Sequence, residues 1–215
     1  MKLYKFKSLH GDSFLHSLDM IVNERLFFAT CEDMNDPEEG SWEIGNLPIN
    51  KKYLERAEQV RNIVDSIRFT SFTSSYDNEL LWAHYAGGFS GICFEYEIDD
   101  SLENLMPMKY SGRPTLSDEE IEKIAAKTIK PQDANILLSK SDSWSYEKEY
   151  RLFLNIDDRD KFISIKPTMV IFGVRGLKYD DVFRQITKKY EIPYAYLSKN
   201  EERYEIIEMG NQPSK

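Results

Sequence analysis

The sequence predicts an α+β fold in which helices flank a mixed, largely antiparallel sheet, either continuous or split. Strand-like segments outnumber long amphipathic helices, and the two kinds do not alternate strictly along the chain. Strict alternation would instead have indicated a doubly wound parallel sheet. A final strand–helix–strand stretch is expected to add one parallel pair.

The N-terminal third begins with a short strand over 3–7, where apolar residues alternate with Lys5 and Lys7. A helix capped by Asp12 follows, because apolar residues recur at helical spacing as far as residue 21. Residues 25–29 are predicted as the next strand. Asn35-Asp36-Pro37 then interrupts regular structure, since Asn and Asp favour turns and Pro restricts the preceding residue.

The middle third contains a polar amphipathic helix over 51–66 and a strand over 67–73. A short helix over 79–85 follows, capped by Asp77 or Asn78 and ended by Gly87-Gly88. Residues 91–98 form a further strand, and 108–110 are a candidate for another.

The C-terminal part begins with a helix that starts at Ser117, which has an acidic residue three positions on, and runs to about 130. We expect 114–139 to be a helical insertion within a single domain spanning 1–215. Strands at 150–156, 170–174, 194–197 and 204–209 and a helix at 179–190 complete the prediction.

Charge and apolar content narrow the classes of function. The 215 residues include 28 basic and 37 acidic side chains, a formal charge of −9 that disfavours broad nucleic-acid binding, which relies on phosphate neutralisation. No apolar run approaches the roughly 20 residues that span a bilayer, and the N-terminus lacks a signal-peptide core. The sequence therefore predicts a cytoplasmic protein without a membrane partner.

The sequence lacks the motifs that mark metal sites and several enzyme classes. Cys31 and Cys93 lie in apolar settings typical of buried free thiols, and without a CxxC pair and with only three histidines no metal is expected. The chain has no GxGxxG, Walker loop, G-x-S-x-G or HExxH motif.

The first candidate site is Trp82-Ala83-His84-Tyr85. In a structural interpretation, Trp82 and Tyr85 are core aromatics and His84 caps a carbonyl. In a functional one, His84 transfers protons near neutral pH, close to a Gly-Gly turn where a ligand can approach the backbone.

The second candidate site is Tyr146 to Arg151. If this segment is extended, Glu147, Glu149 and Arg151 share one face. In a structural interpretation, these charges form a solvated edge. In a functional one, they enter a buried strand, because apolar residues follow at once, and a carboxylate held there orients a hydroxyl or stabilises a developing cation.

Two weaker candidates supply further polar groups. Asn35 and Asp36 form an Asx-turn, or offer a donor and acceptors from a stiff loop. The hydroxyl-rich end of the strand near residue 73 contributes Ser71 and Ser74, which alternation places on opposite faces.

Taken in order, these motifs resemble those of an uncharacterised bacterial domain family. The segments that match are Leu3 to Lys7, Asn35 to Glu39, Trp82 to Ala86 with Gly91-Ile92-Cys93, and Tyr146 to Arg151. Glu38 departs from the pattern, which more often has an aromatic residue there. The resemblance covers nearly the whole chain and implies no function, because the family itself is unassigned.

A more distant resemblance is to ADP-ribosyltransferases of the toxin-like and phage-defence branches. It implies NAD as substrate, with Lys5 or Lys7 in the first-strand position, Ser71 to Ser74 on the middle strand and Glu149 as the late glutamate. Tyr85 would stack on the nicotinamide. The departures are that His84 and Tyr85 lie on a predicted helix and that strand one has no Arg or His.

Three hypotheses follow. The first is an NAD-consuming transferase with Glu149, His84 and Tyr85 as catalytic residues and an unidentified macromolecular acceptor. The second is a noncatalytic sensor that binds a small anion or nucleotide in a pocket framed by Asn35, Trp82, His84 and Arg151. The third, a metal-dependent hydrolase, requires Asp36, His84, Glu147 and Glu149 to converge.

Overall fold

The computed structural model describes residues 1–43, 50–155, 160–175, 180–200 and 203–210. The chain folds into two compact units. The first unit comprises 1–26, 72–100 and 163–215, and the second comprises 27–71 and 101–162. The single domain expected over 1–215 stays a prediction.

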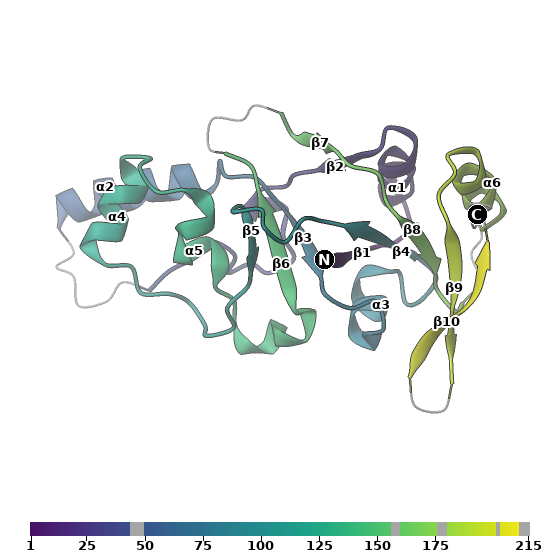
Figure 1. The fold of residues 1–215 in the computed structure, drawn as a ribbon. Coiled ribbons are helices and arrows are strands. Elements are labelled where there is room, and N and C mark those ends of the chain that lie inside the picture. The colour runs from purple at the N-terminus through teal and green to yellow at the C-terminus, as the bar shows by residue number, and fades with distance from the viewer. Residues whose placement is uncertain (44–49, 156–159, 176–179, 201–202, 211–215) are drawn as a thin grey trace. The chain divides into compact units, whose positions relative to one another are not determined.

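The predicted fold class is confirmed, because the strands form a mostly antiparallel eight-stranded sheet flanked by helices (Figure 1). The order along the sheet is β10-β9-β8-β4-β1-β3-β6-β5. A separate two-stranded sheet pairs β2 (Arg25–Phe27) with β7 (Phe162–Ser164), a strand that the sequence did not predict.

The first unit contains most of the sheet. Its strands are β1 (Lys2–Lys7), β4 (Ile92–Glu97), β8 (Met169–Phe172), β9 (Tyr194–Lys199) and β10 (Tyr204–Gly210). Its helices are α1 (Asp12–Val22), α3 (Glu79–Tyr85) and α6 (Asp180–Lys189). β8 and β9 are parallel, which confirms the parallel pair expected from the final strand–helix–strand stretch.

Both faces of this part of the sheet are covered by helices. Trp82 of α3 packs edge-on against Phe6, with ring centroids 5.0 Å apart. Lys5 lies on the opposite face, because neighbouring side chains of a strand alternate. Lys5 pairs with Phe94, Phe94 with Val170, and Val170 with Tyr194, so these four side chains lie on the same face of the sheet. On β9, helix α6 lies over Tyr194.

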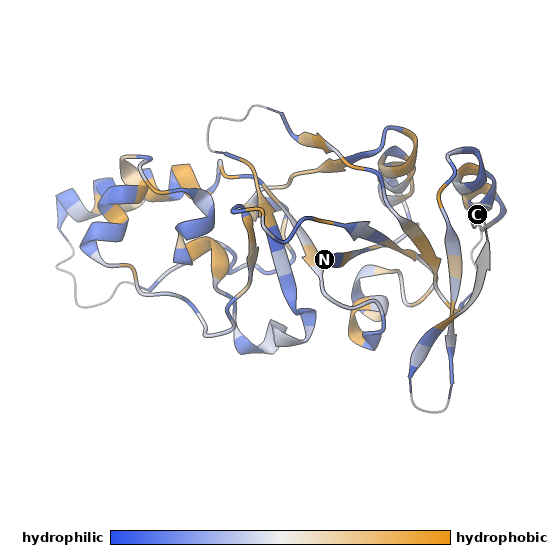
Figure 2. Cartoon of the chain, viewed as in Figure 1, coloured by the Kyte–Doolittle hydropathy of each residue, from blue (hydrophilic) through white to orange (hydrophobic). Residues whose placement is uncertain are grey.

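The second unit contains the remaining strands and most of the short helices. These are α2 (Lys51–Val64), β5 (Leu105–Pro107), α4 (Asp118–Ala125), α5 (Asn135–Leu138), β6 (Glu149–Phe153) and the 3-10 turns Cys31–Asp33, Pro131–Asp133 and Asp142–Glu147. β3 (Phe69–Thr73) carries the chain from this unit into the first. Apolar side chains on α2, α4 and α5 form a core around Phe69 and Phe153, and Figure 2 shows both hydrophilic and hydrophobic residues along α2 and α4.

Most helix starts follow the predicted caps. The Asn78 side chain accepts a hydrogen bond from the Leu80 N–H, and Ser117 forms a capping box with Glu120. Asp12 is the exception: Gly11 is the N-cap of α1, and Asp12 is already the first helical residue. There its carboxylate lies in the first turn, where negative charge interacts favourably with the helix dipole.

Several predicted boundaries were wrong. The helix from Ser117 ends at Ala125 rather than near 130, because Lys127 adopts a left-handed φ of 53°. The strand expected at 108–110 is instead β5 at Leu105–Pro107, and Lys109 forms only an isolated bridge with Ser139. The helices and the 3-10 turn between 114 and 139 agree with the predicted helical content. Residues 156 and 179, which were expected to end a strand and begin a helix, lie outside the described residues.

The glycines after α3 end that helix as expected. Gly87 and Gly88 have φ of 56° and 65°, a conformation that other residues adopt only at a cost. Three positions later, a Cβ at Gly91 would lie 2.3 Å from the Lys7 carbonyl oxygen. This close approach lets β4 begin directly beside the end of β1.

Candidate functional site

The most tightly built group of charges lies inside the second unit. We call it the buried charge cluster, and it consists of Glu39, Lys140, Glu147, Glu149 and Arg151. Each of these residues is less than a tenth exposed, from 0% for Arg151 to 8% for Lys140. Charged side chains are rarely buried to this degree unless they are paired, and here every one is.

Arg151 is the centre of this cluster. Its Nη1 and Nη2 atoms donate to the two carboxylate oxygens of Glu39 at 2.8 and 2.7 Å, a bidentate pair. Nε donates to Glu149 at 2.8 Å, and Nη1 also donates to the Leu137 carbonyl at 2.7 Å. The guanidinium lies 4.2 Å from the Phe69 ring centroid. One side chain therefore links the loop after Asp36, helix α5 and strands β3 and β6.

Lys140 is the second cation of the cluster. Its Nζ donates to Glu147 and to Glu149 at 2.8 Å each, and it lies 3.9 Å from Glu39. Three carboxylates thus surround two cations, and the formal charge of the cluster is −1.

The local backbone explains how Glu147 and Glu149 reach one ammonium. Residues 142–147 form a 3-10 helix, in place of the extended segment considered from the sequence. Lys148 then adopts a left-handed φ of 43°, and β6 begins at Glu149. The left-handed residue thus joins the 3-10 helix to the strand, and in this arrangement the carboxylates of Glu147 and Glu149 both contact Lys140.

The charges of the cluster shift its protonation equilibria. Burial alone would raise the pKa of Glu149, but the neighbouring Arg151 and Lys140 charges hold it well below its ordinary value. Burial also raises the pKa of Tyr110, whose hydroxyl accepts the Glu149 N–H, to about 12. Glu149 is therefore ionised at neutral pH, and two cations neutralise its charge. This arrangement supports a structural role in which Glu149 holds Lys140 and Arg151 in place. Catalysis by Glu149 stays a prediction.

The Trp82 motif lies in the first unit. Trp82 is fully buried, and its indole N–H donates to the Tyr76 carbonyl at 2.6 Å, so it is a core aromatic. His84 is exposed on α3, and Tyr85 is half-buried. The two motifs therefore belong to different units, and the single pocket expected from them stays a prediction.

Two of the three lysines of the first strand, Lys5 and Lys7, are half-buried, whereas Lys2 is exposed and pairs with Glu95. Lys5 lies over the Phe72 ring, with Nζ 5.6 Å from the centroid. Burial lowers the pKa of Lys7. Across the part of the chain that the structure describes, the Lys7 ammonium has no hydrogen-bond or ion-pair partner.

The remaining candidates divide between the units. Asp36 is buried and accepts the Glu38 N–H at 2.9 Å, which confirms the predicted Asx-turn, and its neighbour Asn35 is exposed. Ser71 is half-buried at the second-unit end of β3, whereas Ser74 is exposed in the first unit.

Three of the five cluster residues could be identified from the sequence, whereas the roles of Glu39 and Lys140 were missed. Glu39 belongs to a motif that was singled out, but nothing local distinguishes it from Glu38, which is exposed and pairs with Arg113. Lys140 lies in a polar segment without periodicity. A signal was nonetheless present, because buried Glu149 and Arg151 before an apolar strand require additional partners.

Two further properties concern function. Within 1–43, 50–155, 160–175, 180–200 and 203–210, no helix is long and apolar enough to cross a bilayer. The same residues contain no group of three His, Cys, Asp or Glu side chains arranged to hold a metal ion. The metal-dependent hydrolase is therefore not proposed.

Fold and cluster together define a mixed α+β protein with a buried ionic centre in its second unit. Residues 81–152 of this chain match a family model described as a protein of unknown function (DUF2971). The matched segment contains both the Trp82 motif and the Tyr146 to Arg151 motif, which confirms the predicted resemblance to an unassigned family over these residues. The segments Leu3 to Lys7 and Asn35 to Glu39 lie outside the match. No curated protein and no solved structure is significantly similar to the chain. The resemblance to ADP-ribosyltransferases stays a prediction.

Proposed function

We propose that this protein binds a small anionic ligand, of the nucleotide class, through Lys7 on the first strand. The observation that carries the proposal is that Lys7 is half-buried and that its ammonium has no counter-charge among the described residues. Withdrawing an ammonium from water is unfavourable unless an opposite charge compensates it. An anionic ligand would supply that compensation.

The contrast with the second unit supports this choice. Lys140 and Arg151 are also buried, but three carboxylates already neutralise them. Their cluster has no uncompensated positive charge to offer an anion. Lys7 differs because its charge is left for an external partner, and Lys5 adds a second positive charge two residues away on the same face of β1.

The test is a thermal-shift titration with NAD, AMP and inorganic pyrophosphate. A ligand that binds only the folded state should raise the melting temperature by mass action, with about 2.7 kcal/mol of added stability at a hundredfold excess over Kd. Lys7→Met should abolish the shift from the ligand that binds there. Lys51→Met is the matched control, since Lys51 lies on α2 with a 92% exposed side chain.

The pH dependence provides an independent readout. Burial lowers the pKa of Lys7, and a bound anion favours its charged form, so binding should take up a proton and weaken as pH rises. If none of the three ligands shifts the melting temperature, or if Lys7→Met responds as the wild type does, the proposal fails.

Cleavage of NAD is a second proposal, favoured by the basic residues that β1 contributes at the first-strand position of ADP-ribosyltransferases. The residue that the resemblance assigns to the nicotinamide ribose is Glu149. Incubation of wild-type protein with NAD, with and without protein or nucleic-acid acceptors, should release nicotinamide. Glu149→Gln should stop the release, while Lys51→Met should not. Absence of release from the wild type under all conditions would rule out the transferase.

A further inference from the structure

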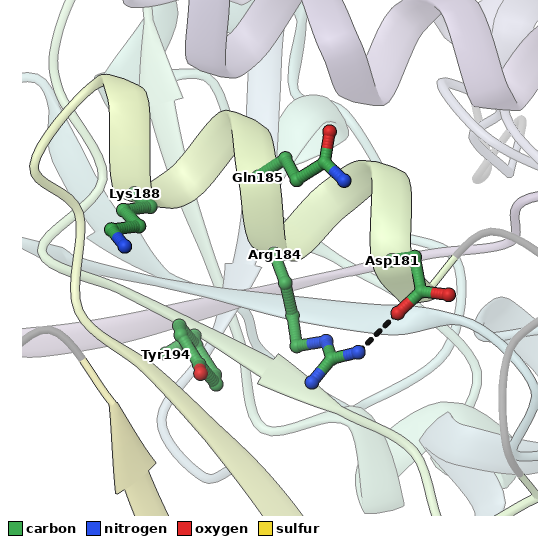
Figure 3. A pocket seen from close by; sticks show the side chains of 5 residues that line it. All are labelled: Asp181, Arg184, Gln185, Lys188 and Tyr194. Atoms are coloured by element: carbon green, nitrogen blue, oxygen red, sulfur yellow. Dashed lines mark hydrogen bonds and ion pairs between the residues drawn. The ribbon is translucent and has the colours of Figure 1, made fainter.

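An open hollow lies in the first unit, between helix α6 and strand β9. Its volume is about 250 Å³, and it is lined by Asp181, Arg184, Gln185, Lys188 and Tyr194 (Figure 3). None of these residues belongs to the motifs found in the sequence or to the buried charge cluster. Lys7 does not line the hollow either.

Positive charge predominates in this lining. Arg184 and Lys188 are one helical turn apart and extend from α6 toward the side on which Tyr194 lies (Figure 3). Asp181 forms an ion pair with Arg184, the only contact drawn among the five residues. Among residues whose positions are described, the Lys188 ammonium has no carboxylate partner. The five lining residues therefore carry two cations and one carboxylate.

The wall contributed by β9 is aromatic. Tyr194 is half-buried, and its ring packs edge-on against Phe172 and Tyr196, with centroids 5.9 and 6.0 Å away. Tyr196 in turn stacks on Phe172 at 5.2 Å. These contacts hold the Tyr194 ring in place, and a fixed aromatic ring beside cations is suited to a ligand that combines a planar ring with negative charge.

The size of the hollow limits the ligand. Small-molecule sites typically enclose about 300–1,000 Å³, so a hollow of about 250 Å³ lies just below this range and favours a mononucleotide over a dinucleotide. Because the hollow is open to solvent, its electrostatic interactions are screened, and binding should weaken with added salt.

We propose that this hollow is a second ligand site, distinct from Lys7, which binds a nucleoside monophosphate. The phosphate contacts Lys188 and Arg184, and the base lies against Tyr194. The ligand class agrees with the proposed function, but the site stands on separate residues, so either proposal can fail without the other.

The experiment is a calorimetric titration of the whole chain with AMP, adenosine and inorganic phosphate. AMP should bind more tightly than either fragment, because only AMP carries both ring and charge. Lys188→Gln should weaken AMP binding about tenfold, the loss expected for one charge-assisted contact. Lys189→Gln is the matched control: Lys189 is the next residue, does not line the hollow and lies over the Tyr190 ring.

Further variants separate the outcomes. Tyr194→Leu should reduce the affinity for AMP while leaving the weak binding of phosphate unchanged. Equal affinity for AMP and phosphate, or an unchanged affinity in Lys188→Gln, would overturn the site. If Lys7→Met abolishes AMP binding and Lys188→Gln does not, the nucleotide binds at Lys7: the hollow is then refuted and the proposed function is supported.

Discussion

Replacing Arg151 with methionine tests whether the buried charge cluster holds the second unit together. Methionine replaces the aliphatic part of the arginine side chain and introduces no new charge, so the substitution removes chiefly the guanidinium. Glu39 loses both of its short hydrogen bonds, and its remaining cation is Lys140 at 3.9 Å. Glu149 loses one contact but keeps Lys140 at 2.8 Å.

The expected magnitude follows from these contacts. Removing Arg151 changes the formal charge of the cluster from −1 to −2 and leaves the Glu39 carboxylate, which is 1% exposed, with Lys140 at 3.9 Å as its counter-ion. Breaking a buried pair in this way typically costs about 3–5 kcal/mol. We expect Arg151→Met to lower the free energy of unfolding by that amount, with the largest share arising from Glu39.

The assay is urea unfolding followed by circular dichroism, with Arg113→Met as the matched control. Arg113 pairs with Glu38, one residue before Glu39, but both side chains are more than two-fifths exposed, so its loss should cost less than about 1 kcal/mol. Adding Glu39→Gln to Arg151→Met removes the stranded carboxylate and should recover part of the stability. If Arg151→Met costs no more than Arg113→Met, the cluster does not stabilise the protein.

Two further predictions concern pH and thiol chemistry. Two cations lower the pKa of Glu149 in the folded state, so its contribution to the free energy of unfolding should be complete above the unfolded pKa of about 4.3 and fall as the pH decreases below it. Urea unfolding between pH 3 and 7 measures this loss. Unchanged stability over this range would contradict the lowered pKa. Burial raises the pKa of Cys31 to about 12 and also raises the pKa of Cys93. A disulfide reagent that reacts with thiols should therefore label neither cysteine of the native protein at pH 8 and both in denaturant. Rapid labelling of the native protein would show that a thiol is accessible.

Much of the fold could be predicted because its signals are local. Asn78 and Ser117 cap helices through hydrogen bonds to residues two and three positions away, which the sequence displays directly. The predictions failed where distant contacts determine the backbone. β7 is only three residues long and carries no pattern of its own, so it is recognisable only from its pairing with β2.

The sequence by itself determined the fold class, the parallel C-terminal pair and the importance of the segment from Tyr146 to Arg151. Tertiary structure decided what that segment does: Arg151 meets Glu39, 112 residues earlier, and Glu149 meets Lys140. Periodicity and caps depend on neighbours within one or two turns, whereas the partner of a buried charge depends on which distant loop the folded chain brings to it. The same reason left the α6–β9 hollow unnoticed, because Lys188 and Tyr194 acquire a common role only after the helix packs on its strand.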